Sequence, residues 1–319
     1  MQLFQFIWPG PMAAQAIHVA ATLGVADYLH PTPRLVDELA AATNTHPESL
    51  RRLLRSLKSV GVFSEDESGK FQNTPMSDCL RRDHPESIRA WAVFLSAPFL
   101  WKSLGALHET VVTGQTAVDR IFGKAFFTYL AEHSDDAAIF NAAMGRGSAM
   151  VAPLVVSAYD FSGFTRIVDV GGGNGTLLRG ILAANPRVRG VLFDLPQVVA
   201  TADVDAEIIG GDFFEGIPSG GGAYIFKGVV HDWSTTDAVR ILKNCRRAIR
   251  KDGTLLLVEG VMPSSESNPG NFMDVLMMTL TGGQERTESD FRSLLADAGF
   301  SLQRVIPLGP TFLLECKPL

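Results

Sequence analysis

Cysteine and basic charge are both scarce in this sequence, and each shortage excludes a class of protein. Cys79, Cys245 and Cys316 are the only cysteines among 319 residues, they lie far apart, and they form no CxxC pair. A disulfide scaffold is therefore excluded, and reduced thiols in a reducing compartment are expected. The formal net charge of −6 gives no attraction to nucleic acid or anionic lipid. We therefore expect no nucleic-acid partner.

The apolar N-terminus, "MQLFQFIWPGPMAAQA", lacks the basic residues that open a secretory signal, and Pro9-Gly10-Pro11 interrupts it early. A membrane-spanning helix needs about 20 consecutive apolar residues, which this segment does not supply. We expect neither a signal peptide nor a membrane span here. The chain is predicted to be cytoplasmic, with no membrane partner.

Helical patterns dominate the first half of the chain, and residues 36–74 have a more specific outline. A short helix, a turn and a helix starting at Pro47 are followed by two short strands, at 61–65 and 70–74. This outline is that of a winged helix-turn-helix, which suggests DNA binding. Between residues 31 and 90, however, nine basic residues are matched by nine acidic ones, so no net positive surface faces phosphates. We interpret the unit as a dimerisation or packing domain.

Strands and helices alternate from about residue 165 onward. Ser234 with Asp237, and Thr287 with Asp290, have the spacing of capping boxes at helix starts. Alternation over this length predicts an α/β fold with a doubly wound, mostly parallel sheet. Two closing strands, near enough to form a hairpin, predict one antiparallel edge strand. The predicted strands are 166–170, 189–195, 207–213, 223–230, 253–261, 302–309 and 311–318, and the predicted helices begin at 174, 197, 234 and 287.

A glycine-rich turn, "DVGGGNG" from Asp169 to Gly175, lies between a predicted strand and a predicted helix. Glycines permit a sharp turn and close approach of a ligand to the backbone amides at the helix start. Asp194 and Asp212 end the next two strands, so all three acids are expected at the carboxyl edge of the sheet. A dinucleotide dehydrogenase and a methyl-donor enzyme both fit. The acid inside the strand and the closing hairpin are typical of the S-adenosylmethionine fold.

Six motifs in order carry a resemblance to a known family: "DVGGGNGTLL", "FDLPQVV", "GGDFFEGIP", "KGVVHDWS", "LLLVEGVMP" and "GGQERTESDF". Together with the winged-helix outline they resemble the class I S-adenosylmethionine-dependent small-molecule O-methyltransferases, which include caffeic acid, acetylserotonin and bacterial polyketide or phenazine enzymes. The resemblance implies a homodimer with a winged-helix dimerisation domain at 1–92. It also implies a catalytic domain at 93–319, in which a helical segment, 93–159, roofs the substrate and a Rossmann-like core, 160–319, binds the cofactor.

The resemblance also assigns roles to single residues. His231, at the end of "AYIFKGVV", would be the general base, with Glu259 and Glu285 on either side of it. Asp232 would cap the next helix or contact substrate, and Trp233 would pack beside the adenine. The S-adenosyl-L-methionine residues would be Gly171 and Gly173 for the methionine part, Asp194 for the ribose hydroxyls, Asp212 and Phe213 for the adenine, and Lys227 for closing the pocket.

This assignment leads to a specific chemistry. An imidazole with its ordinary pKa of about 6.5 suits acceptance of a phenolic proton near neutral pH, while hydrogen bonds that Glu259 and Glu285 accept from it would orient the ring. Phe140 and Met144, one turn apart on a helix, and Met277 are predicted to line a flat apolar slot. The acceptor would then be one hydroxyl of a small aromatic molecule, and no metal site is predicted.

Three alternatives stay open at this point. Some relatives bind S-adenosylmethionine but catalyse hydroxylation, decarboxylation or pericyclic rearrangement. A winged-helix regulator that senses the cofactor would need no catalytic residues, and an NAD-dependent oxidoreductase would bind a dinucleotide instead.

Overall fold

The computed structural model describes residues 2–263 and 270–319. Contacts divide the chain into two compact units, residues 1–102 and 103–319. The division falls ten residues after the boundary expected at 92/93, inside helix α8 (Pro98–Gly105).

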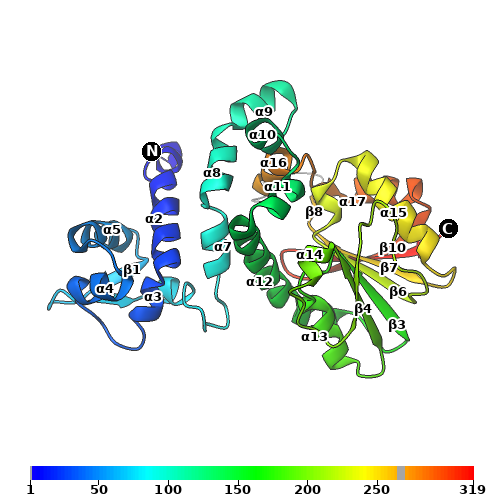
Figure 1. Ribbon diagram of the computed structural model, residues 1–319, viewed down its shortest axis with the longest axis horizontal. Helices are drawn as coiled ribbons and strands as arrows, with labels where there is room; N and C mark the ends of the chain where they lie inside the picture. Colours follow the sequence, from blue (N-terminus) through cyan, green and yellow to red (C-terminus); the bar gives the residue numbers. More distant parts are fainter. Residues whose placement is uncertain (1, 264–269) are drawn as a thin grey trace. The chain divides into compact units, whose positions relative to one another are not determined.

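The first unit is helical and carries a small hairpin (Figure 1). Helix α5 (Pro47–Ser59) begins at Pro47, as the sequence predicts, and buries Leu50, Leu54 and Leu57. Strand β1 (Phe63–Glu65) pairs antiparallel with β2 (Phe71–Asn73), so a wing follows the helix-turn-helix. The other helices of this unit are α1 (Gln2–Ile7), α2 (Gly10–Leu23), α3 (Val25–Tyr28), α4 (Val36–Thr43), α6 (Pro75–Asp78) and α7 (Arg89–Phe94).

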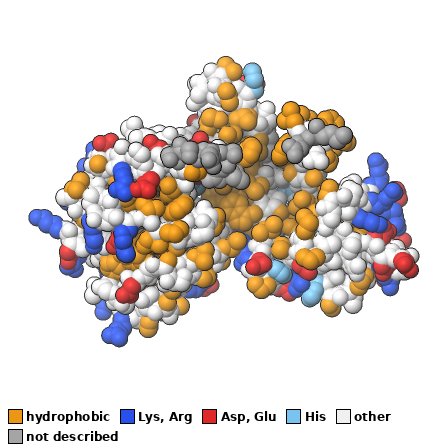
Figure 2. Space-filling view, turned by 180° about the vertical axis from the view of Figure 1, so that it is seen from behind, with side chains coloured by type: hydrophobic (Ala, Val, Ile, Leu, Met, Phe, Trp, Pro, Cys, Tyr) orange, Lys and Arg blue, Asp and Glu red, His pale blue; other side chains and the backbone are white. Residues whose placement is uncertain are grey.

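Large apolar side chains at the start of the first unit are exposed to solvent. Figure 2 shows hydrophobic side chains gathered around the N-terminal residues. Monomeric proteins rarely expose contiguous apolar patches of this kind, which usually mark contact surfaces. The most exposed of them are Leu3, Phe4, Phe6, Ile7, Trp8 and Met12.

The second unit begins with helices and continues as an α/β domain (Figure 1). Its first helices are α9 (Leu107–Thr113), α10 (Ala117–Phe122), α11 (Phe126–Glu132) and α12 (Ser134–Ala158). The strands are β3 (Arg166–Val170), β4 (Arg189–Asp194), β5 (Glu207–Gly210), β6 (Ala223–Lys227), β7 (Thr254–Glu259), β8 (Val261–Met262), β9 (Arg286–Thr287), β10 (Phe300–Pro307) and β11 (Phe312–Pro318). The helices among them are α13 (Thr176–Ala184), α14 (Pro196–Val199), η1 (Val230–Asp232, a 3₁₀ turn), α15 (Thr235–Ala248), α16 (Asn271–Leu280) and α17 (Glu288–Asp297).

The main sheet has the order β10-β11-β7-β6-β3-β4-β5, and the strands from β7 to β5 are parallel. The buried side chains of β3, β6 and β7 alternate between two apolar clusters, because successive side chains of a strand point to opposite faces. One cluster includes residues of α15 and α17, and the other includes residues of α12 and α13. The predicted doubly wound, Rossmann-like α/β sheet is confirmed.

The closing hairpin corrects one prediction. β11 is antiparallel, as expected, but it lies between β7 and β10 and is not the edge strand. The burial of the two strands explains this order. β11 contains the fully buried Leu313, Leu314 and Cys316, whereas the middle of β10 exposes Gln303 and Arg304, which suits an edge that faces water.

Helix α12 is long and apolar enough to cross a membrane by length and composition alone. It nevertheless packs against α11 and α13, and a Cβ on its Gly145 would lie 3.2 Å from the side-chain nitrogen of Asn174. These contacts are those of a helix inside a globular unit.

Candidate active site

The glycine-rich turn between β3 and α13 has the backbone conformation that the sequence predicts. Gly171 and Gly173 have φ of +67° and +61°, in the left-handed region that glycine adopts without strain. A Cβ on Gly171 would lie 2.8 Å from a methyl carbon of Val229, whereas a Cβ on Gly173 would meet nothing within 4 Å. The turn is therefore closely packed beneath Gly171 and open at Gly173, where a ligand can approach the backbone.

Two carboxyl groups, one buried and one partly buried, lie beneath this turn. Asp169, at the end of β3, is 1% exposed, and neither of its oxygens makes a hydrogen bond of normal geometry within the described residues. Burial, reinforced by the neighbouring Asp194 charge, raises the pKa of Asp169 to about 7. Asp194 accepts hydrogen bonds from the Gly173 and Leu195 amides, at 2.8 and 2.7 Å. A buried carboxyl group without a hydrogen bond of normal geometry is rare in folded proteins and marks a candidate ligand site.

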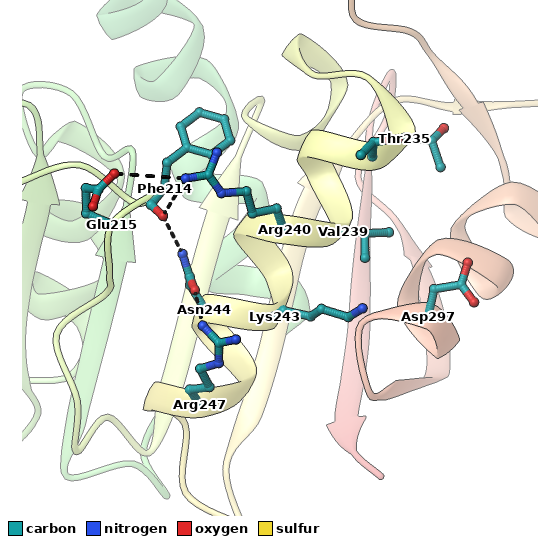
Figure 3. A pocket seen from close by; sticks show the side chains of 10 residues that line it. Phe214, Glu215, Thr235, Val239, Arg240, Lys243, Asn244, Arg247 and Asp297 are labelled. Carbon is teal, nitrogen blue, oxygen red and sulfur yellow. Dashed lines mark hydrogen bonds and ion pairs between the residues drawn. The ribbon is translucent and has the colours of Figure 1, made fainter.

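The loop after β5 carries Asp212 and Phe213. Asp212 accepts a hydrogen bond from the Phe214 amide at 2.8 Å, which closes the loop on itself. The side-chain amide of Asn244, on α15, donates to the Phe213 carbonyl at 2.8 Å. It also donates to the Phe214 carbonyl at 3.0 Å (Figure 3). These bonds fix the loop against α15.

His231 lies in the 3₁₀ turn that follows β6. Its Nδ1 lies 2.7 Å from Oε1 of Glu285 and donates the hydrogen bond, while its Nε2 lies 3.6 Å from Oδ1 of Asp232. The side chain keeps 20% of its surface exposed, so a bound molecule can reach the ring. The Glu285 bond directs the free lone pair of the neutral imidazole to Nε2.

The electrostatics of His231 correct the expectation of an ordinary imidazole. Burial lowers the pKa of His231, but the carboxyl groups of Asp232, Glu259 and Glu285 outweigh it and raise the pKa to about 10. Without ligands the ring is therefore protonated at neutral pH. A base with this pKa is matched to a phenol, whose own pKa is about 10, but it must first lose its proton.

Glu259 does not bond the imidazole, in contrast to the expectation. Its Oε1 accepts from the Val229 and Val230 amides at 3.1 and 2.8 Å. These amides follow the end of β6 and have no sheet partner for their N–H groups, which explains why they recruit the carboxylate. Glu259 therefore acts on His231 through its charge and by holding the backbone that leads to it.

Asp232 differs in part from the prediction, whereas Trp233 packs against one of the predicted adenine residues. Ser234 caps α15, because its side chain accepts from the Asp237 amide, so Asp232 does not cap this helix. Burial raises the pKa of Asp232 to about 7, and its carboxyl group faces His231. Trp233 packs edge-on against Phe213, with ring centroids 5.8 Å apart.

Lys227, at the end of β6, joins the sheet to α12. Its Nζ donates to Oγ of Ser148 at 3.1 Å, and burial lowers its pKa. Ser148 in turn donates to the carbonyl of Met144, one helical turn earlier. The helix with the predicted substrate residues is thus tied to the strand that leads to His231.

Aromatic side chains connect the predicted substrate and adenine residues. Phe140 packs edge-to-face on Phe127 at 6.1 Å, and Phe127 stacks on Trp233 at 5.6 Å. Trp233 meets Phe213, so the rings form a continuous path from α12 to the loop after β5. Phe127 was not singled out in the sequence, because an aromatic residue in an apolar helix has no distinguishing spacing.

Met277 is buried in α16. Three residues earlier on this helix, Asp274 accepts a hydrogen bond from the Glu285 amide at 2.8 Å. Sequence reasoning missed Asp274, although a lone acid in the apolar segment "NFMDVLMMTL" is a usable signal. It also missed Arg286, which is buried beside Glu285.

A polar groove of about 720 Å³ lies on the outer surface of α15, lined by Phe214, Arg240, Lys243, Asn244, Arg247 and Asp297 among others (Figure 3). It contains none of the predicted site residues. Across residues 2–263 and 270–319, no group of three or more His, Cys, Asp or Glu side chains is arranged to hold a metal ion.

Comparison with known proteins places this geometry in a family. Residues 101–301 match the O-methyltransferase domain, and residues 8–83 match the O-methyltransferase dimerisation domain. The chain is 40% identical to phenazine O-methyltransferase PhzM of Lysobacter antibioticus, over 97% of this chain and 94% of that protein. It is 38% identical to the mitomycin biosynthesis 6-O-methyltransferase of Streptomyces lavendulae, over 95% and 90%.

A solved structure agrees with these matches. NcsB1, an O-methyltransferase from neocarzinostatin biosynthesis in complex with S-adenosylmethionine and 2-hydroxy-5-methyl naphthoic acid, superposes with a TM-score of 0.82. It is 31% identical, and the match covers 96% of each chain. The chain therefore belongs to the family of S-adenosylmethionine-dependent O-methyltransferases.

Proposed function

We propose that this enzyme moves the methyl group of S-adenosyl-L-methionine to a hydroxyl of a small aromatic natural product, with His231 as general base. The observation that carries the proposal is the hydrogen bond from His231 Nδ1 to Glu285, which makes Nε2 the nitrogen that would accept the proton once the ring is neutral. The enzyme would act as a homodimer, in keeping with the dimerisation domain at residues 8–83.

The residues present fit the cofactor. The backbone at Gly173 is open to a ligand, and the buried carboxyl group of Asp169, which makes no hydrogen bond of normal geometry, suits a positively charged one. Gly171 and Gly173 would hold the methionine part, Asp194 the ribose hydroxyls, Asp212 and Phe213 the adenine, and Lys227 would close the pocket. When bound, S-adenosylmethionine supplies an electrophilic methyl group on a positively charged sulfur.

His231 would then take the proton of the acceptor hydroxyl at Nε2, while Glu285 stabilises the imidazolium that forms. General base catalysis of this kind contributes about 10²–10⁴-fold in rate, and alignment of the acceptor contributes about 7–11 kcal/mol. Alignment is assigned to Phe140, Met144 and Met277 and to the aromatic path that leads to Trp233. The reaction would be metal-independent, because Glu285 binds the His231 ring and Oε1 of Glu259 accepts from two backbone amides.

The aromatic nature of the acceptor is inferred from two features. Phe140 belongs to a cluster of edge-to-face aromatic rings, a surface that suits a flat molecule. Relatives named for phenazine, mitomycin and naphthoate methylation act on such molecules.

The test uses S-adenosylmethionine with an isotopically labelled methyl group and a panel of hydroxylated phenazines, quinones and naphthoates. We expect label in the ether methyl of a product, unchanged by EDTA. Turnover that leaves the label on the donor would indicate hydroxylation, decarboxylation or rearrangement. Loss of turnover with EDTA and its return with Mg²⁺ would refute metal independence.

A further inference from the structure

The guanidinium group of Arg286 lies behind the turn that carries His231. Arg286 begins β9 and is 2% exposed. Its Nη1 donates to the Val230 carbonyl at 2.9 Å, and its Nη2 donates to the Trp233 carbonyl at 2.9 Å. These two carbonyls stand on either side of His231 and Asp232, so one side chain grips both ends of the turn.

The turn has little internal support. Its own backbone bonds, from the Asp232 amide to the Val229 carbonyl and from the Trp233 amide to the Val230 carbonyl, measure 3.2 and 3.4 Å, at the long end of the normal range. β6 ends at Lys227, and the sheet reaches the turn only through Glu259 at the end of β7, whose Oε1 accepts from the Val229 and Val230 amides. Its position depends on contacts from elsewhere in the chain.

The segment 283–286 supplies most of these contacts. The Gln284 amide donates to the His231 carbonyl at 2.9 Å, and Glu285 binds the His231 ring. Gly283 packs so closely that a Cβ there would lie 2.0 Å from the His231 carbonyl oxygen. Glu285 holds the ring and Arg286 holds the backbone, from neighbouring positions in one segment.

We propose that Arg286 is a positioning residue for the reaction: its forked guanidinium fixes the His231 turn so that the imidazole keeps its place against Glu285 and the acceptor. The proposal rests on the proposed role of His231 as general base. Arginine is needed because its rigid fork serves two diverging carbonyls, whereas the ammonium of lysine is a single compact donor on a flexible stem.

The experiment compares Arg286→Lys with Arg246→Lys. Arg246 is a matched control, because it also donates to two backbone carbonyls, those of Gly299 and Leu319, at 3.1 and 2.7 Å, and neither belongs to the proposed site. A small misplacement of a catalytic group costs roughly 10²-fold in rate. We therefore expect Arg286→Lys to lower kcat by roughly 10- to 100-fold, with S-adenosylmethionine affinity nearly unchanged. Arg246→Lys should leave kcat near the wild-type value even where it lowers Tm.

A double-mutant cycle separates this proposal from the proposed function. In a His231→Ala background, Arg286→Lys should cause no further loss of kcat, because the group that it positions is absent. An equal loss of kcat in both backgrounds, or full activity of Arg286→Lys, would overturn the role proposed for Arg286. Neither result would bear on the role of His231 as base. Full activity of His231→Ala would instead refute His231 as the base.

Arg286→Gln, which keeps an amide donor but loses the charge, is measured alongside to guard against a variant that does not fold. Lower kcat with retained cofactor binding in either variant supports the proposal. If neither variant binds S-adenosylmethionine, Arg286 supports the cofactor site or the fold as a whole, and its assignment to the His231 turn is overturned.

Discussion

At the scale of single residues, the site is defined by an excess of carboxyl groups around one imidazole. Asp232, Glu259 and Glu285 raise the pKa of His231 to about 10, and Asp169 adds a further buried carboxyl group near Lys227. These four carboxyl groups outnumber the nearby cations His231, Lys227 and Arg286, and an excess of buried negative charge is unfavourable. A positively charged ligand would relieve it, so cofactor binding and the protonation of His231 should be linked.

The pKa of His231 should therefore depend on the charge of the bound molecule. A sulfonium near the ring disfavours the imidazolium, whereas the neutral sulfur of S-adenosylhomocysteine does not. We expect a lower pKa with S-adenosylmethionine than with S-adenosylhomocysteine, measured by NMR of histidine-labelled enzyme without acceptor. Because the protonated ring cannot act as base, the rate should rise as pH increases through this pKa. Equal pKa values in both complexes would contradict the linkage.

Sequence predicts these residues unevenly. The pairing of His231 with Glu285 was expected from the resemblance of their motifs to the O-methyltransferases, and the two side chains are hydrogen-bonded. The amide partners of Glu259 could not be foreseen, since they depend on the path of the backbone after β6. Arg286 was missed because an arginine beside a glutamate usually indicates an exposed, solvated pair.

At the scale of elements, the sequence predicts the bounds of the inner strand β3 well, but it does not predict that β10 is an edge strand of the sheet. β3 spans Arg166–Val170, as the sequence predicts, because a strand buried on both faces is a continuous apolar run. Two strands that follow each other closely in the sequence are expected to pair as a hairpin. The sequence does not show which of the two, β10 or β11, also pairs with β7. That choice follows from the burial of β11 against the exposed middle of β10.

The segment 283–286 behaves as an element of the site, and Gly283 is its closest contact with the His231 turn. Gly283→Ala must displace either the segment or the turn, because the new Cβ would meet backbone atoms. We expect destabilisation of about 1–3 kcal/mol, as for other overpacked positions, and a kcat at least about 10-fold lower. Gly163→Ala is the control, since a Cβ there would meet nothing within 4 Å. Thermal unfolding measures the stability of the two variants, and turnover assays measure their kcat. Equal stability and equal kcat of Gly283→Ala and Gly163→Ala would refute the role of Gly283 in placing the His231 turn.

At the scale of the whole molecule, two compact units divide the tasks of association and chemistry. Residues 8–83 match a dimerisation domain, and the first residues expose Phe4, Phe6 and Met12. The sequence supported this division through the balance of charges in the winged-helix unit. The position of the boundary between the units could not be predicted from the sequence, because α8 is an apolar helix like its neighbours.

The exposed apolar residues at the N-terminus should contribute to the dimer. Phe6→Asp combined with Met12→Asp places charge in this patch, and burying unpaired charge is unfavourable. We expect a shift from dimer to monomer in light scattering. Ile208→Asp, on β5, is the matched control and should stay dimeric, because Ile208 is exposed outside the dimerisation domain. A dimer in both variants would exclude the patch from the interface.

The role of His231 is tested most directly by acceptors that differ in the acidity of the hydroxyl. Single-turnover methyl transfer is measured for wild type and His231→Ala, with one acceptor whose hydroxyl has a pKa near 10 and a ring-fluorinated analogue that is already ionised at the working pH. If His231 removes the proton, its loss should cost about 10²–10⁴-fold with the first acceptor and little with the second. Equal losses with both acceptors would mean that His231 serves the reaction in some way other than as a base.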